Sequence, residues 1–134
     1  MPGELRFSKT VVDIDKRSFT IQVLLFDNGS FVSITEGQEK IGGLTASIGS
    51  LQFHTIVKTT PIIPAKLESL FLKLISEQLS SIITGINLVS AFIPKKLENN
   101  TAKILITNFL RNFAKSCYLY IFLLFFLKLL HKII

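Results

Sequence analysis

The sequence changes character at Lys115, and this change constrains how the chain can fold. Residues 1–115 mix polar and apolar positions, whereas residues 116–127 are dominated by Leu, Phe, Ile and Tyr and contain no charged side chain. Large exposed apolar patches are rare on monomeric proteins, so such a block needs to be covered by protein or lipid. We therefore expect one folded domain over residues 1–115 and a separate apolar tail over residues 116–134.

The length of the apolar tail leaves three interpretations open. As a helix, residues 117–130 would extend roughly 20 Å at 1.5 Å per residue, which is short of the roughly 30 Å hydrocarbon core of a bilayer. The tail is then a short membrane element, a buried extension of the preceding helix, or a C-terminus foreign to the domain. Membrane contact is expected only through residues 116–134.

Composition points to one intracellular domain with a basic surface. The chain has 134 residues and a net charge of +6, which fits a single domain. Its basic residues are scattered, with adjacent pairs only at Lys16–Arg17 and Lys95–Lys96, so we expect a solvated surface and no nucleic-acid partner. The single cysteine, Cys117, excludes an internal disulfide. No apolar signal begins the chain, and we expect the cytoplasm, with the nucleus as a second compartment.

Alternation of apolar and polar residues predicts several strands in the first half. The tetrapeptide Asp27-Asn28-Gly29-Ser30 predicts a hairpin turn, because Asn and Gly tolerate the positive φ of tight turns. Short connections between the strands favour an antiparallel meander. The predicted strands cover residues 10–14, 19–26, 31–34, 41–48 and 51–58.

The second half reads as helix, strand and helix. We expect Pro61 and Pro64 to end strand pairing and to precede a first helix that runs to Ile83 and is capped by Gly85. A strand over residues 86–93 is apolar enough to be central. A second helix starts near residue 101, capped by Asn99 or Asn100. The predicted apolar stripes are Leu67, Leu70, Phe71 and Leu74 on the first helix, and Ile106, Phe109, Leu110 and Phe113 on the second. The fold class is therefore α+β, an antiparallel sheet with two flanking helices.

No residue pattern supports catalysis, and we predict a non-enzymatic protein with no catalytic, cofactor-binding or metal-binding residues and no cofactor. His54 and His131 each lie far in sequence from other metal-ligand types, and Cys117 reads as a small hydrophobic residue. Neither a phosphate-binding loop nor a dinucleotide fingerprint is present. The carboxylates lie in expected turns, element ends or solvated helix faces: Asp13, Asp15, Asp27, Glu36, Glu39, Glu68, Glu77 and Glu98.

The linear order of four segments carries a resemblance. Phe31-Val32-Ser33-Ile34 and Lys40-Ile41-Gly42-Gly43-Leu44-Thr45-Ala46-Ser47-Ile48 precede the first predicted helix. Asn87-Leu88-Val89-Ser90-Ala91-Phe92-Ile93 and Ala102-Lys103-Ile104-Leu105-Ile106 follow it. This order resembles the small proteasome assembly chaperones, most of all the assembly chaperone 4 family, with the chaperone 3 family next. The resemblance covers residues 19–115, and the apolar tail has no counterpart in it.

The resemblance implies a sandwich-like domain that pairs with proteasome assembly chaperone 3. The pair would assist early assembly of the 20S proteasome α-ring by holding α-subunits, without ligand or cofactor. Open sheet edges and faces make such pairing physically reasonable. Two other functions stay open: a small membrane-associated adaptor of trafficking type tethered by its tail, and an enzyme whose site the sequence does not reveal.

Overall fold

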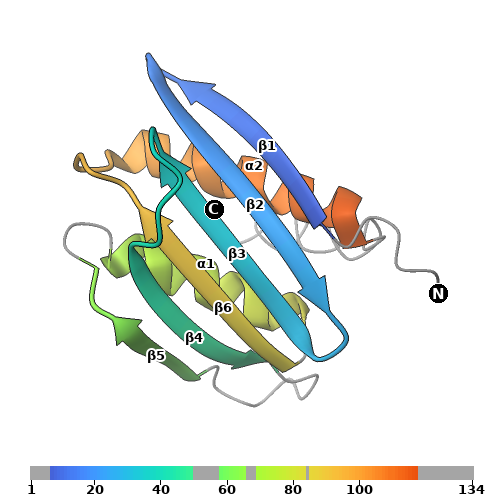
Figure 1. The fold of residues 1–134 in the computed structure, drawn as a ribbon. Coiled ribbons are helices and arrows are strands. Elements are labelled where there is room, and N and C mark those ends of the chain that lie inside the picture. Colours follow the sequence, from blue (N-terminus) through green and yellow to red (C-terminus); the bar gives the residue numbers. More distant parts are fainter. Residues whose placement is uncertain (1–6, 50–57, 66–68, 84, 118–134) are drawn as a thin grey trace.

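The structure, a computed structural model, describes residues 7–49, 58–65, 69–83 and 85–117, which form one sheet and two helices (Figure 1). The six strands lie in the order β1-β2-β3-β6-β4-β5, which confirms the predicted α+β class. The elements are β1 (Phe7–Ile14), β2 (Arg17–Phe26), β3 (Gly29–Glu36), β4 (Gly43–Gly49), β5 (Lys58–Ile63), α1 (Ser69–Ile82), β6 (Gly85–Phe92) and α2 (Asn99–Cys117).

Two tight hairpins build the first three strands. The predicted turn at residues 27–30 is confirmed, because β2 ends at Phe26 and β3 begins at Gly29. The other hairpin was not predicted: Asp15 and Lys16 join β1 to β2 with φ values of 48° and 65°. A two-residue hairpin turn requires positive φ, and Asp tolerates it better than most residues. β1 begins at Phe7, three residues before the predicted strand, because its pairing with β2 continues as far as Leu24.

The position of β6 changes the topology from the one predicted. β6 lies between β3 and β4, parallel to β3 and antiparallel to β4. The prediction of a continuous meander therefore holds for β1 to β3 and is wrong for β4. The prediction that residues 86–93 form a central strand is confirmed. Burial explains the insertion, since Val89 and Ala91 are completely buried and a strand this apolar is most stable with neighbours on both sides.

The prediction that Pro61 ends strand pairing is wrong. Pro61 lies within β5 and is paired with Thr45 of β4. Because β5 is an edge strand, a residue without an N–H group costs no ladder hydrogen bond if it faces the solvent side. Most of the strand predicted for residues 51–58 lies outside the described residues, as does Leu67 of the predicted α1 stripe.

Both helices cover the same face of the sheet. α1 packs on β4, β5 and β6, and α2 packs on β1 and β2 (Figure 1). The core lies between these two layers. Its members are apolar and almost fully buried: Ile14, Phe19, Ile21, Val23, Val32, Ile34, Phe71, Leu72, Ile75, Leu79, Val89, Ala91, Ile93, Leu105, Phe109 and Leu110.

The stripe predicted for α1 is displaced from the observed one. Leu70 and Leu74 are exposed by 68% and 39%, although Phe71 is buried as predicted. The buried face of α1 carries Ser76 and Ser80, so apolarity alone does not mark it. On α2 the predicted residues Phe109 and Leu110 are buried, and Ile106 is half-buried. Leu105, which was not predicted, is also buried. The side chain of Phe113 lies outside the described residues.

A buried polar cluster accounts for Ser80 on α1, whereas the buried hydroxyl of Ser76 has no hydrogen-bond partner among the described residues. The Asn87 side chain donates to Ser80 Oγ and to the carbonyl of Ile83, both at 3.2 Å, and accepts from Ser30 Oγ at 2.7 Å. Ser47 bonds to Ser80 Oγ and donates to the Ser76 carbonyl. Buried polar groups are tolerated when they are paired in this way. The cluster fixes α1 against β3, β4 and β6 and is structural.

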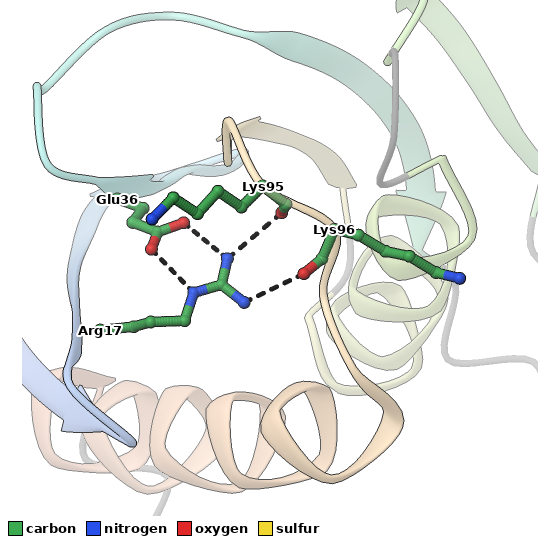
Figure 2. A network of polar contacts seen from close by, with 4 residues as sticks. All are labelled: Arg17, Glu36, Lys95 and Lys96. Atoms are coloured by element: carbon green, nitrogen blue, oxygen red, sulfur yellow. Dashed lines mark hydrogen bonds and ion pairs between the residues drawn. The ribbon is translucent and has the colours of Figure 1, made fainter.

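Arg17 joins three parts of the chain that are distant in sequence. Its guanidinium donates to both carboxylate oxygens of Glu36 on β3, at 2.8 Å and 2.7 Å. It also donates to the carbonyls of Lys95 and Lys96, at 3.2 Å and 3.0 Å, in the segment that leads from β6 to α2 (Figure 2). Bidentate pairs of this kind define geometry as well as contributing energy, so Arg17 holds the start of α2 against the end of the sheet.

The expected tail falls almost entirely outside the described residues. Ser116 and Cys117 complete α2, and nothing beyond them is described. Within the described ranges, no helix is both long enough and apolar enough to span a bilayer.

Candidate functional site

The sheet face opposite the helices is the candidate site. Successive side chains of a strand point to opposite faces, so the strands that bury Val32 and Val89 under the helices direct Phe31 and Leu88 to the other side. In Figure 1 this second face is toward the viewer and both helices lie behind the sheet. No described helix covers it. We call it the open face.

An apolar row crosses the open face. The register pairs Phe7 with Leu24, Leu24 with Phe31, Phe31 with Leu88, and Leu88 with Ala46. These five residues, which we call the apolar row, come from five neighbouring strands. At about 4.8 Å between strands, the row is roughly 20 Å long. The side chains of Phe7 and Leu24 at its β1 end are exposed by 52% and 38%.

A second set of apolar side chains extends the row toward one end of the strands. Ile86 on β6 is directly opposite Ile48 on β4, and Phe26 closes the β2 end of the neighbouring hairpin. These three side chains are exposed by 52%, 64% and 54%. Together with the apolar row they form a contiguous apolar surface, and on a monomer such a surface marks an interaction site more often than chance exposure.

Beside the apolar row, a polar row crosses the open face. Lys9, Gln22, Ser33 and Ser90 lie side by side across four strands. Glu39, in the connection between β3 and β4, accepts from Lys9 and Gln22, with a shortest contact of 2.8 Å. An interface with an apolar part beside charged groups is directional, because a partner must match both.

The described residues do not assemble a catalytic constellation. No group of three His, Cys, Asp or Glu side chains in the described ranges is placed to hold a metal ion. The hydrogen bond from Arg17, aided by its charge, lowers the pKa of Glu36, so this carboxylate is a poor general base. His54, His131 and Glu68 lie outside the described residues, and so does the side chain of Cys117.

A groove of about 440 Å³ lies between β5 and α1. Thr45, Ile63, Leu70 and Lys73 are among its lining residues, and the described lining contains no carboxylate, histidine or cysteine. It therefore offers an apolar hollow with one cation at its rim, without a nucleophile or a general base.

Runs of consecutive apolar residues in β2 and β6 indicate the open face, although the alternation of apolar and polar residues does not. Strand β2 alternates through its first half and then reads Val23-Leu24-Leu25-Phe26. Consecutive apolar residues in a strand indicate that both faces meet apolar surroundings. The same holds for Leu88 and Val89 of β6. This pattern predicted a central position for β6, but it did not reveal that the described helices cover only one of the two surfaces.

The comparisons with known proteins bear on the fold. No protein-family model matches the sequence, and no curated protein matches it. A solved structure does match, from a crystal structure described as a novel chaperone complex for yeast 20S proteasome assembly. The two chains are 14% identical, the match covers 94% of each, and the TM-score is 0.51. The shared feature is the fold. At 14% identity the likeness shows the fold alone.

Proposed function

We propose that this protein is a non-catalytic chaperone subunit that assists 20S proteasome assembly. The observation that carries the proposal is the apolar row on a sheet face that the protein's own described helices leave uncovered. The fold shared with a chain from a yeast proteasome assembly chaperone complex supports it. Such a role requires complementary surfaces and no reacting group.

The open face is proposed as the surface that binds a second chaperone subunit of the assembly chaperone 3 type. Its apolar surface would be buried in the pair, and its polar row, around Lys9 and Glu39, would fix the orientation. The pair would then hold α-subunits during early assembly of the α-ring. The cytoplasm, with the nucleus as a second compartment, is the proposed location.

The contribution of two side chains of the open face to binding can be estimated. Complete burial of an Ile side chain contributes about 1.5–3 kcal/mol, and Ile48 and Ile86 are 64% and 52% exposed. Covering both by a partner would contribute about 1.5–3 kcal/mol, which corresponds to about 10- to 100-fold in the dissociation constant.

The test co-expresses the full chain with an assembly chaperone 3 from the same organism and measures complex formation by native mass spectrometry and titration. We expect a one-to-one complex that captures an α-subunit. The double substitution Ile48→Ser and Ile86→Ser should weaken pairing by about 10- to 100-fold. The matched control is Leu70→Ser on α1, which removes a side chain that is 68% exposed on the other layer and should leave pairing unchanged.

Two results would contradict this proposal. Absence of any complex would remove the chaperone function, and binding of the full chain to lipid vesicles would then favour the tail-tethered adaptor. A complex that forms equally well with the double variant would retain the function and exclude the open face as its site.

A further inference from the structure

The two edges of the sheet differ in how well they are protected against pairing with another strand. β1 and β5 are the outermost strands (Figure 1). β5 contains Pro61, and its register with β4 shifts between Leu44 and Thr45. β1 has eight residues in unbroken register with β2 and contains no proline. Proline and irregularity are standard protections of sheet edges, so β1 is the edge that can accept another strand.

The β1–β2 hairpin determines which backbone groups face outward. Ile14 and Arg17 flank the two-residue turn and are paired, and in such hairpins the flanking pair exchanges backbone hydrogen bonds. Hydrogen-bonded and non-hydrogen-bonded pairs alternate along antiparallel strands. The N–H and C=O groups of the odd-numbered residues of β1 therefore point away from β2, and the central ones belong to Lys9, Val11 and Asp13.

The charges on this edge are spaced for self-pairing. Lys9 and Asp13 lie four residues apart on the open-face side of β1, two positions on either side of Val11. When a second β1 pairs antiparallel about a twofold axis through Val11, Lys9 of each copy lies opposite Asp13 of the other. Opposite charges in directly facing positions stabilise a strand pair, and like charges destabilise it. Asp13 has no ion-pair partner among the described residues of its own chain.

We propose that two copies of this protein associate through antiparallel pairing of their β1 edges, centred on Val11. The neighbouring registers are less favourable. An axis through Lys9 would place the two lysines opposite each other, and an axis through Asp13 would do the same with the two aspartates. The proposed register also places Val11 opposite its own copy on the open face, where it is 58% exposed in one chain.

Edge pairing of this kind is compatible with a partner on the open face. A twofold axis perpendicular to the sheet keeps each face on its own side, so the joined sheet has twelve strands, with both apolar rows on one side and the helices on the other. The homodimer thus depends on β1 alone, and its test does not depend on the proposed chaperone function.

The decisive experiment uses two full-length variants with one reversed charge each, Lys9→Asp and Asp13→Lys. Native mass spectrometry and sedimentation measure the association of each variant alone and of the two variants mixed. Each variant alone places like charges in both facing positions, and we expect self-association to weaken by about tenfold or more relative to wild type. In the mixture, aspartates at positions 9 and 13 of one chain face lysines at positions 13 and 9 of the other. We therefore expect heterodimers to form selectively when the two are combined.

The control variant is Glu39→Gln. Lys9 pairs with Glu39 in its own chain, at 2.9 Å, so this substitution removes the internal partner of Lys9 without changing the strand register. Because Lys9 is then free to pair with Asp13 of the other copy, self-association should be as strong as in the wild type or stronger, and it should not weaken. The proposal is overturned if the wild type stays monomeric up to about 100 μM, or if the mixed variants show no preference for the heterodimer over either homodimer.

Discussion

The ion pair between Arg17 and Glu36 allows a quantitative prediction about stability. Its side chains are only 17% and 12% exposed, and the contact is bidentate. The Arg17 guanidinium also lies 5.2 Å from the centre of the Phe19 ring and bonds to two backbone carbonyls. Two substitutions separate these contributions: Glu36→Gln retains the shape but removes the charge, and Arg17→Met removes all of the hydrogen-bond donors.

The expected magnitudes follow from this geometry. A hydrogen bond to a charged group contributes about 1.5–3 kcal/mol, whereas an exposed ion pair contributes about 0–1 kcal/mol. Since the pair is mostly buried and Gln retains one acceptor, Glu36→Gln should lower the free energy of unfolding by about 1–2 kcal/mol. Arg17→Met should cost about 2–4 kcal/mol, because it also leaves the Glu36 carboxylate unpaired. The double variant should cost about 1 kcal/mol less than the sum.

The same pair makes a prediction about pH. The Arg17 hydrogen bond holds the pKa of Glu36 below its ordinary value, and Glu36 in turn raises the pKa of Arg17. For a carboxyl group with a lowered folded-state pKa, the stabilisation is complete above the unfolded value of about 4.3 and is lost as the pH falls through the folded value. The difference between wild type and Glu36→Gln should therefore be full at neutral pH and shrink below pH about 4.

Urea unfolding followed by far-ultraviolet circular dichroism provides the assay, because the chain has no Trp and both tyrosines, Tyr118 and Tyr120, lie in the tail. All variants are compared at one protein concentration, since association would shift apparent stability. The control is Glu77→Gln, which removes an exposed pair with Lys73 at 4.0 Å and should cost about 0.3–0.5 kcal/mol. The reasoning fails if Glu36→Gln costs no more than this control, or if its effect does not change with pH.

Two further stability predictions concern the buried interior and use the same unfolding assay. Asn87→Ala should lower the free energy of unfolding by about 2–3 kcal/mol, because it leaves buried partners unsatisfied. The control Asn108→Ala loses a single exposed hydrogen bond to its own helix and should lower it by about 0.5 kcal/mol. Equal losses would contradict a structural role for the buried polar cluster. Gly85→Ala should lower the free energy of unfolding more than Gly37→Ala does. Both glycines have positive φ, at 99° and 77°, but of the two only Gly85 lies so close to the Asn28 carbonyl that an added Cβ would collide with it. Equal losses would show that only the strained φ matters, at about 1–2 kcal/mol per residue.

Periodicity in the sequence predicted most elements because it depends on local burial. Alternation located β2 and β4, the turn at residues 27–30 located β3, and the apolar run at 86–93 located β6 and its central place. Local patterns could not predict that β6 inserts between β3 and β4, because strand order depends on contacts between distant segments. Pro61 was misjudged for a related reason. Whether a proline ends strand pairing depends on whether the strand is an edge strand, and the sequence does not state which strands are edges.

The candidate site was predicted only as a kind of surface. The absence of a catalytic pattern and the open sheet pointed to binding, but no residue could be assigned to it. The apolar row is visible only in register, because its five members are separated by up to 81 positions, from Phe7 to Leu88, and are aligned by strand pairing. The Arg17 contact with Glu36 and the β6–α2 segment depends on the same tertiary arrangement.

The composition of β6 supports the proposal that the open face binds a partner. Val89 and Ala91 on one side are buried by the helices, and Leu88 and Phe92 on the other side lie on the open face. A strand that is apolar on both faces is typical of a sheet covered on both sides. In this protein both helices cover the same face, so the described chain satisfies only half of what β6 requires. Apolar side chains at Phe31, Ile48 and Ile86 gain little from exposure to water, and the partner proposed for the open face would cover them.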